Sequence, residues 1–216
     1  MTDSDAAPPF DTEYQTFGKY DGRTLMYRSR YSGSTRTSLQ VFTFSSDATG
    51  KLWSQMQSLD PTVSGYDPTT VGGIDANAPP SAADVQSTSA IDPPFLRMAK
   101  SMTIGHSWGS GSVVTVNFAT GLPSTVGATQ MSTLLGVEDV TLPDVSVSGA
   151  IPVSITYSGC LKITDQRAAV NLGGASQRIS WYCPGGVGLV KRIVAITNTG
   201  SSTTVRTRIF ELKSIQ

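Results

Sequence analysis

Apolar and polar positions alternate along much of the second half of the chain, which is the period of a β-strand with one buried face. The alternation is clearest in Val114, Val116 and Phe118. Turn residues, mainly glycine and proline, separate most such segments, and no helical pattern lies between them. The segments are 112–118, 129–137, 140–142, 151–157, 161–164, 178–182, 189–197 and 203–212. The pattern predicts an all-β protein with little helix, in which an antiparallel curved sheet forms a half-barrel, barrel or sandwich.

The last two segments predict a hairpin at the end of the chain. Residues 189–197 and 203–212 are rich in β-branched residues and flank the turn Asn198-Thr-Gly200. Four cations fall on this hairpin: Lys191, Arg192, Arg206 and Arg208. We interpret them as a solvated strand face in preference to a basic binding stripe.

A second hairpin is expected in the first half of the chain. Aromatic and β-branched residues gather around Leu25 and Tyr27 and again in 41–44, and Ser32-Gly33-Ser34 lies between them as a turn signal. Another turn follows at 47–50.

Residues 60–94 predict a long Pro/Ser-rich loop that interrupts the strands. Five Pro- or Gly-containing pairs punctuate it, and proline removes a backbone donor and disfavours helix in the preceding residue. Loops of this length in compact domains are commonly lids or insertions. One weak helix is expected at 81–90. Another is expected before the loop, where Leu52, Trp53 and Met56 have the spacing of one helical face.

Length and local composition predict the domain organisation. A chain of 216 residues suffices for one all-β domain. Residues 1–17 are polar and contain proline, so we expect a flexible leader followed by a single β domain over 18–216. We interpret the leader as what is left after removal of a signal peptide or lipid anchor, although a cytosolic protein can begin with the same kind of tail.

The charge composition argues against electrostatic partners. The chain has 16 basic and 16 acidic residues, which make up only 15% of it, so neither nucleic acid nor anionic lipid is indicated. Serine, threonine and glycine take the place of charge, which is more typical of extracytoplasmic β proteins. The sequence contains no run of 18 apolar residues, so no transmembrane helix is expected.

The two cysteines, Cys160 and Cys183, support the same compartment. Neither belongs to a Cys-x-x-Cys pair, and with one histidine in the chain a zinc site would need scattered carboxylates. We therefore predict a disulfide that closes a loop of about 24 residues and contributes about 3 kcal/mol through chain entropy. Two separate buried thiols are the alternative. No metal site and no cofactor are predicted.

The pentapeptide Gly105-His106-Ser107-Trp108-Gly109 matches the G-x-S-x-G pattern of a serine nucleophile. Its context does not fit, because a polar segment precedes it and a strand rather than a helix follows. No histidine follows His106 to act as the base, and an extended backbone points His106 away from Ser107. We interpret the motif as a turn that leads into a strand, with Trp108 as an apolar anchor.

Other chemistry is equally weakly supported. A Cys–His dyad would need a free thiolate beside the single histidine. Glu138-Asp139 is interpreted as a solvated turn pair, and Gly185-Gly-Val-Gly188 precedes a strand rather than a phosphate-binding helix. The three tryptophans, Trp53, Trp108 and Trp181, are candidate anchors of either an apolar ligand or the core.

Three segments in order resemble the signposts of a family of bacterial secreted proteins and lipoproteins of largely unknown function. They are Ile104-Gly-His-Ser-Trp108, Leu135-Gly-Val-Glu-Asp-Val-Thr-Leu-Pro143 and Trp181-Tyr-Cys-Pro-Gly-Gly-Val-Gly-Leu-Val-Lys191. The match covers 101–216. It departs from the family pattern at Asp144-Val145, where Ala-Gly is usual, and at the extra glycine after Pro184.

The resemblance implies a half-barrel of the LolA and LppX shape, in which proteins of that general form hold lipids or lipoproteins against a concave apolar face. It also implies an envelope location and binding of a hydrophobic ligand or protein partner. It supplies no catalytic residue. Cys183 stands where the family often has alanine, which suits a disulfide specific to this protein.

We therefore expect a non-enzymatic extracytoplasmic protein, whether periplasmic, cell-surface or secreted. Its curved sheet, capped by 60–94, is expected to bind a lipid, another apolar molecule or an envelope protein. The alternative is a surface or assembly protein without a small ligand, whose strands pair with other subunits. A serine hydrolase using Ser107 is a remote alternative.

Overall fold

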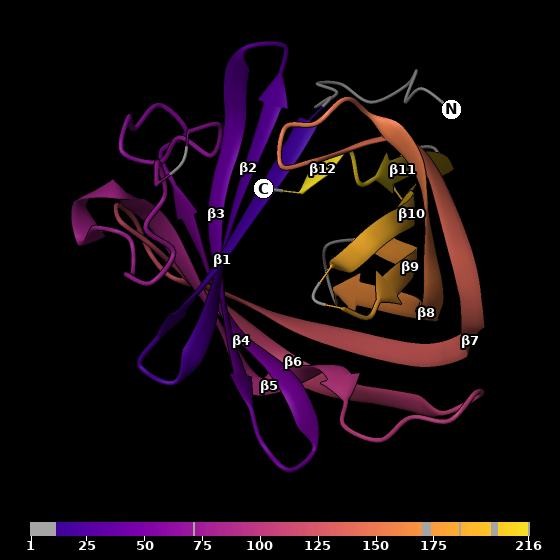
Figure 1. Ribbon diagram of the computed structural model, residues 1–216. Coiled ribbons are helices and arrows are strands. Elements are labelled where there is room, and N and C mark those ends of the chain that lie inside the picture. The colour runs from indigo at the N-terminus through magenta and orange to yellow at the C-terminus, as the bar shows by residue number, and fades with distance from the viewer. Residues whose placement is uncertain (1–11, 71, 170–173, 186, 200–202, 216) are drawn as a thin grey trace. The chain divides into compact units, whose positions relative to one another are not determined.

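The structure is a computed structural model that describes residues 12–70, 72–169, 174–185, 187–199 and 203–215 (Figure 1). Within these residues the secondary structure is strand apart from one 3-10 helix, η1 (Ala82–Asp84). The strands are β1 (Thr12–Tyr20), β2 (Arg23–Ser32), β3 (Thr35–Ser46), β4 (Gly50–Leu59), β5 (Val85–Ala99), β6 (Ser107–Phe118), β7 (Ser124–Val147), β8 (Val153–Ala169), β9 (Gly174–Cys183), β10 (Gly188–Thr199), β11 (Thr203–Glu211) and β12 (Ser214–Ile215).

Strands β1 to β11 follow one another in hydrogen-bonded order, and the short β12 pairs with β7 in parallel. The predicted fold class, an antiparallel all-β sheet, is therefore confirmed. The order has two ends, β1 and β11, as expected for an open half-barrel sheet rather than a closed barrel. Both predicted hairpins are present, as β2–β3 and β10–β11.

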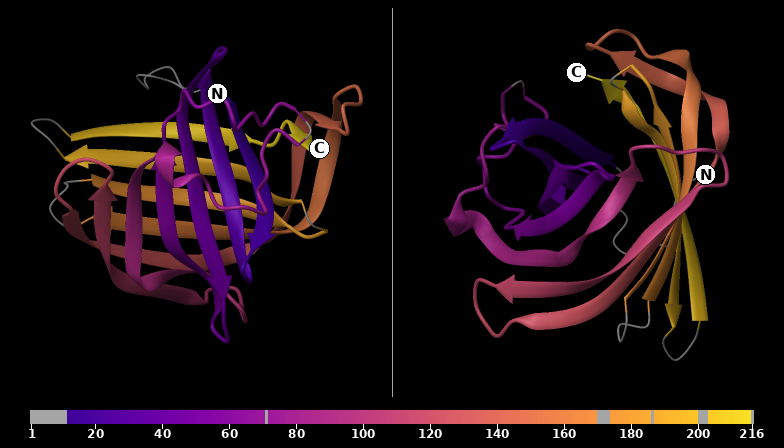
Figure 2. Two further views of the ribbon diagram at one scale, coloured as in Figure 1. Left: turned by 90° about the vertical axis from the view of Figure 1, so that its left-hand side faces the viewer. Right: turned by 90° about the horizontal axis from the view of Figure 1, so that it is seen from below.

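Contacts between residues divide the chain into two compact units, whereas a single domain was predicted. Of the described residues, the N-terminal unit comprises those within 12–101 and 110–128, and the C-terminal unit comprises those within 102–109 and 129–215. Figure 2 shows β8 to β11 of the C-terminal unit lying side by side as long strands, in agreement with their pairing.

Strand pairing corrects several predicted boundaries. β1 begins at Thr12, so 12–17 of the expected leader form a strand, because they pair with 26–31 of β2. Residues 1–11 lie outside the described residues. β5 begins at Val85, which shortens the loop to 60–84. The two prolines Pro93 and Pro94 lie where the β4–β5 register skips from Ala90 to Phe95, so the ladder is interrupted where proline could not donate.

Neither predicted helix forms. Residues 52–56 belong to β4, and the register shifts beside Phe44 and Trp53 explain why the apolar spacing departs from strict alternation. Of 81–90, only η1 is helical, and its first turn is capped by the Ser81 hydroxyl, which accepts a hydrogen bond from the Ala83 N–H.

Two pairs of predicted segments merge into long strands. The segments 129–137 and 140–142 both lie in β7, so Glu138-Asp139 is part of a strand rather than a turn. The segments 151–157 and 161–164 both lie in β8. A bulge-like glycine with positive φ, Gly159, lies between them, and its N–H donates to the Asp139 carboxylate at 3.0 Å.

The C-terminal unit has a core that includes the predicted disulfide, which is confirmed between Cys160 and Cys183. β8 and β9 pair with Leu161 opposite Tyr182, so the cysteines occupy the next opposed positions. The buried members of this core are Val140, Leu142, Val145, Cys160, Trp181, Cys183 and Val190. In the chain-entropy estimate the bond contributes about 3 kcal/mol.

Candidate ligand-binding site

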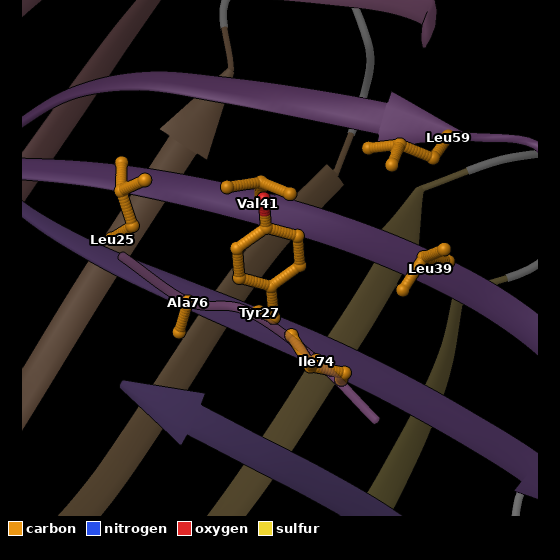
Figure 3. Packing of buried hydrophobic residues seen from close by; sticks show 7 residues of the cluster. All are labelled: Leu25, Tyr27, Leu39, Val41, Leu59, Ile74 and Ala76. Atoms are coloured by element: carbon orange, nitrogen blue, oxygen red, sulfur yellow. The ribbon is translucent and has the colours of Figure 1, made fainter. Parts of the chain in front are cut away.

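The N-terminal unit presents an apolar sheet face that loop 60–84 covers (Figure 3). Alternation along β2 and β3 turns one set of side chains to this face, since residues two apart in a strand share a side. The sheet supplies five buried residues and the loop supplies two. They are Leu25, Tyr27, Leu39, Val41 and Leu59 from the strands and Ile74 and Ala76 from the loop.

The loop approaches the sheet closely at Ala76. A Cβ added to Gly18 of β1 would lie 2.2 Å from the Ala76 carbonyl oxygen, so only glycine fits under the loop there. The next residue of β1 also bonds to the loop, because the Lys19 N–H donates to Asn77 Oδ1 at 2.9 Å. The loop therefore lies on the backbone of β1 as well as on the side chains of β2 and β3.

Two tyrosines connect the loop to the covered face. The rings of Tyr27 and Tyr66 stack at 5.7 Å, and the Tyr27 hydroxyl donates to the Ala78 carbonyl at 2.7 Å. The Tyr66 hydroxyl donates to the Asp84 carboxylate at 3.1 Å. Burial is the main reason that the pKa of each phenol lies above its usual range. Both hydroxyls therefore stay protonated and keep donating at physiological pH.

Arg36, at the start of β3, holds the first part of the loop. Its guanidinium donates to three backbone carbonyls, those of Pro61, Val63 and Tyr66. One charged side chain thus satisfies three carbonyls that the irregular backbone leaves without a ladder partner. Arg36 is also close enough to Asp60 and Asp67 of the loop to help lower the pKa of both carboxyls.

Two Asp-Pro-Thr turns shape the loop between these anchors. Asp60 accepts hydrogen bonds from the backbone and hydroxyl of Thr62, and Asp67 does the same with Thr69. These bonds hold the pKa of both carboxyls below the usual range, with the threonine hydroxyl as the main cause. The turns are therefore formed by ionised aspartates at neutral pH.

An open depression of about 400 Å³ borders the covered face. Its lining combines one end of β1 and β2 with one edge of the loop: Thr12, Tyr14, Tyr31, Gly33, Ser34, Asp67 and Thr69. Tyr14 lies opposite Ser29 in the β1–β2 register, and Tyr31 is two residues further along β2. Both tyrosines therefore share the covered face, and the depression lies at its end.

Ser29 is a polar residue within this face. It is buried and lies two residues from Tyr27, and its hydroxyl has no hydrogen-bond partner among the residues that the structure describes. A buried hydroxyl without a partner is costly, so such a group is a natural point for a ligand's polar atom. Ser29 lies on the covered face between the tyrosines of the depression and the apolar residues.

The three predicted tryptophan anchors do not form one site, since Trp53 belongs to the N-terminal unit and Trp108 and Trp181 to the C-terminal unit. Trp53 packs against Phe42 and Phe95 with ring centroids 5.6 and 5.8 Å away. Trp181 belongs to the disulfide core and donates to Glu138 Oε1 at 2.5 Å. Trp108 is buried beside the edge of the His106 ring.

The serine motif forms a turn that leads into β6, as predicted. The Gly105 N–H donates to the Leu134 carbonyl at 2.8 Å, and β6 begins at Ser107. The Ser107 hydroxyl bonds to the hydroxyl of Thr133 at 2.8 Å, and the His106 ring lies against Trp108. The serine is thus bonded to another hydroxyl rather than to a base.

The cations of the last hairpin, which were interpreted as a solvated strand face, divide between two sides of the sheet. Lys191 and Arg192 are consecutive and therefore point to opposite faces. Lys191 forms an ion pair with Glu211, opposite it on β11, at 2.8 Å. Arg192 and Arg208 are half-buried on the other face, and the side chain of Arg206 lies outside the described ones. Arg192 and Arg208 therefore do not form the solvated face that was expected.

The sequence did not indicate Arg36, Tyr66 or Ser29 as parts of a site. Nothing in the hydrophobic pattern distinguishes Arg36 from other strand arginines, because its role depends on where the loop backbone passes. Ser29 continues the alternation of Leu25 and Tyr27 along β2, and that alternation was the available signal that it faces inward.

Comparisons with known proteins found no match. No protein-family model, no curated protein and no solved structure matches the chain. Among the described residues there is no helix long and apolar enough to cross a membrane. The same residues contain no group of three or more histidine, cysteine, aspartate or glutamate side chains that would hold a metal ion.

Proposed function

We propose that this is a non-enzymatic extracytoplasmic binding protein, and that the apolar face under loop 60–84 takes up a lipid or another amphiphile. The observation that carries the proposal is that loop 60–84 covers this apolar face with few buried side chains. Five sheet residues are buried beneath a loop whose described residues contribute Ile74 and Ala76 to the buried cluster, with Tyr66 partly buried at its side. A ligand that replaced these few contacts would leave the strand ladder intact.

The energetics are compatible with exchange between loop and ligand. Burying one Ile side chain stabilises by about 2 to 3 kcal/mol, and each buried CH₂ of an acyl chain contributes about 0.8 kcal/mol. Roughly four methylene groups would therefore match the contribution of Ile74. The depression beside Tyr14 and Tyr31 offers the adjoining opening, and the Ser29 hydroxyl offers a hydrogen bond to the polar end.

The extracytoplasmic part of the proposal rests on the disulfide between Cys160 and Cys183. Disulfides persist in oxidising compartments and are rare in the cytosol. Detection of the intact bond in protein isolated from its native source would support this location. Free thiols in such protein, alkylated before lysis, would contradict it.

Binding is best tested with a fluorescent polyene fatty acid and with the full chain. We expect saturable binding to the native protein and tighter or faster binding to Arg36→Gln, because this substitution frees the loop from three carbonyl contacts. The exposed Arg23→Gln on β2 is the matched control and should leave binding unchanged. Absence of binding to all three proteins would overturn the proposal.

Ser29→Ala distinguishes the polar contact from the apolar face. It should weaken binding of the fatty acid but leave binding of an alkane of the same length unchanged, because only the acid has a group to meet the hydroxyl. Equal losses for both ligands would mean that the substitution alters the fold of the face instead.

The second candidate function is a surface or assembly protein, and the sheet edges favour it. β1 and β11 end the strand order with nine residues each, and such edges can pair with further strands. The exposed face of β7 also carries Met131, Leu135 and Val137. Analytical ultracentrifugation separates the two functions, since assembly requires oligomers that grow with concentration in the absence of lipid.

A further inference from the structure

The hairpin that joins β7 to β8 extends past a neighbouring strand of the C-terminal unit. β9 pairs with 161–168 of β8, and Cys183 at the end of β9 is bonded to Cys160. Residues 153–159 of β8 therefore lie beyond the end of β9. Figure 2 shows this end of the hairpin in orange, and we call residues 147–153 the β7–β8 tip.

The β7–β8 tip carries aliphatic side chains that are exposed. Ile151 is 85% exposed, Val153 is 55% exposed and Val147 is 43% exposed. Ala150 and Pro152 between them are exposed as well. Single exposed apolar residues are ordinary on protein surfaces, whereas a contiguous apolar group indicates a contact with another apolar partner.

The tip belongs to a segment of the sequence without charge. Between Asp144 and Lys162 there is no acidic residue, no basic residue and no histidine. Charged side chains are the groups that most oppose entry into the apolar region of a bilayer. The tip can therefore leave water without carrying a charge with it.

Hydrogen bonds within the hairpin satisfy polar groups of the tip. The Ala150 N–H donates to the Val147 carbonyl at 3.1 Å and closes a turn, whose central residues Ser148 and Gly149 both have positive φ, as in a type I′ turn. The Ser146 hydroxyl donates to the Ala150 carbonyl at 2.7 Å. Because these groups are already paired within the protein, less hydrogen bonding to water is lost when lipid surrounds the tip.

We infer that the β7–β8 tip inserts into the interface of a lipid bilayer. The size of the tip favours a bilayer over a second copy of the chain or another protein, because a stable protein interface takes about 20–30 residues from each side. The proposed contact is independent of the apolar face under loop 60–84, which belongs to the N-terminal unit.

The depth of insertion is set by the nearest acidic residue. Amphipathic elements enter about 5–10 Å into the boundary between headgroups and acyl chains. At about 3.3 Å per residue the stretch from Asp144 to Ser148 spans roughly 13 Å, so Asp144 stays at the level of the headgroups when the hairpin enters lengthwise. The insertion does not require anionic lipid, since the tip contributes no cation to attract it.

Co-sedimentation of the full chain with phosphatidylcholine vesicles tests the insertion. We expect saturable binding that high salt changes little, because salt does not screen an apolar contact. Ile151→Asp should weaken binding by about tenfold or more, because a charge replaces an aliphatic side chain that enters lipid. Ser158→Asp adds the same charge at an exposed position of β8 outside the tip and should change binding by less than about twofold.

Ile151→Trp provides a fluorescence measurement of the same contact. Its added indole should emit at shorter wavelength when vesicles are present, and brominated phosphatidylcholine should quench it. Ser158→Trp is the control and should be quenched no more than the native protein. Quenching that is equal in the two variants would contradict insertion of the tip.

Fatty-acid binding by Ile151→Asp separates this insertion from the function proposed above. It should be unchanged, because the apolar face belongs to the other unit. Absence of vesicle binding by the native chain, or equal vesicle binding by the native chain and Ile151→Asp, would overturn the insertion. Oligomers that Ile151→Asp dissociates in ultracentrifugation, without vesicle binding by the native chain, would identify a second copy as the partner and would also overturn it.

Discussion

The two units stabilise their buried cores in different ways. In the N-terminal unit, loop 60–84 lies on an apolar sheet face and is held by hydrogen bonds from Arg36 and Tyr27 and by the stacking of Tyr66 on Tyr27. In the C-terminal unit, a covalent bond between Cys160 and Cys183 joins β8 to β9 within the core. The first kind of closure is reversible on the time scale of loop motion, whereas the second is permanent in an oxidising compartment.

This difference suits the N-terminal unit to the proposed exchange of a ligand and the C-terminal unit to a rigid core. No strand of the described sheet lies within loop 60–84, so the proposed uptake of a ligand requires no strand pair to break. The disulfide joins two neighbouring strands of the C-terminal sheet, so it restrains the core of that unit covalently. The following changes test the contrast, in order of expected effect.

Leu39→Ala should have the largest effect. Leu39 is fully buried under the loop, and removal of its side chain should lower the free energy of unfolding by about 3 kcal/mol through lost burial and a cavity. Urea unfolding measures the change. Leu135→Ala is the control, because Leu135 is 44% exposed on β7 and should cost less than about 1 kcal/mol. Similar losses for both would show that the covered face is not a packed core.

Cys160→Ala combined with Cys183→Ala should lower the free energy of unfolding by about 3 kcal/mol. Hydrogen exchange should accelerate in β8 and β9 but not in β2 and β3, since the bond joins strands of the C-terminal unit. Dithiothreitol treatment of the native chain should reproduce the effect. Acceleration across both units would mean that the disulfide stabilises them together.

Gly18→Ala should displace the loop. The new Cβ would lie 2.2 Å from the Ala76 carbonyl, and relief of such overpacking costs about 1–3 kcal/mol. Limited proteolysis should then cut loop 60–84 faster. Gly65→Ala within the loop is the control, because a Cβ there meets no atom within 4 Å. Unchanged proteolysis of the Gly18 variant would contradict the close approach.

Acidification should loosen the loop by the smallest amount. The carboxyls of Asp60 and Asp67 have lowered pKa values in the folded state, so their contribution is complete above the ordinary aspartate pKa and is lost as pH falls through the lowered one. The amide signals of Thr62 and Thr69 should therefore stay constant from pH 7 to about pH 4 and change below it. Asp67→Asn should abolish the change at Thr69 alone. A change near neutral pH would contradict this account.

Alternation and turn residues were sufficient to predict the strands of the second half and both hairpins. They failed where bulges break the period, as at Trp53, because an irregular strand then imitates a short helical face. They also failed at Pro93-Pro94, where a strand accommodates proline by interrupting its ladder. The two compact units could not be predicted, because the density of contacts between strands cannot be obtained from local patterns.

The candidate sites were harder to predict than the fold. Cys160 and Cys183 were identifiable because cysteine chemistry allows few pairings, and the bond is confirmed. The role of Arg36 depends on carbonyls 25 to 30 residues away. The resemblance to secreted lipoproteins, and the function that it implies, stay predictions.

The strand order has a consequence for how the chain acquires its structure. From β1 to β11 every strand bonds to its neighbours in sequence, so most pairing closes short loops and the topology favours rapid folding for a β protein. β12 is different, because Ser214 pairs with Ser146 far earlier in the chain. During synthesis each hairpin can therefore form as it leaves the ribosome, while the parallel pairing of β12 with β7 awaits the last residues.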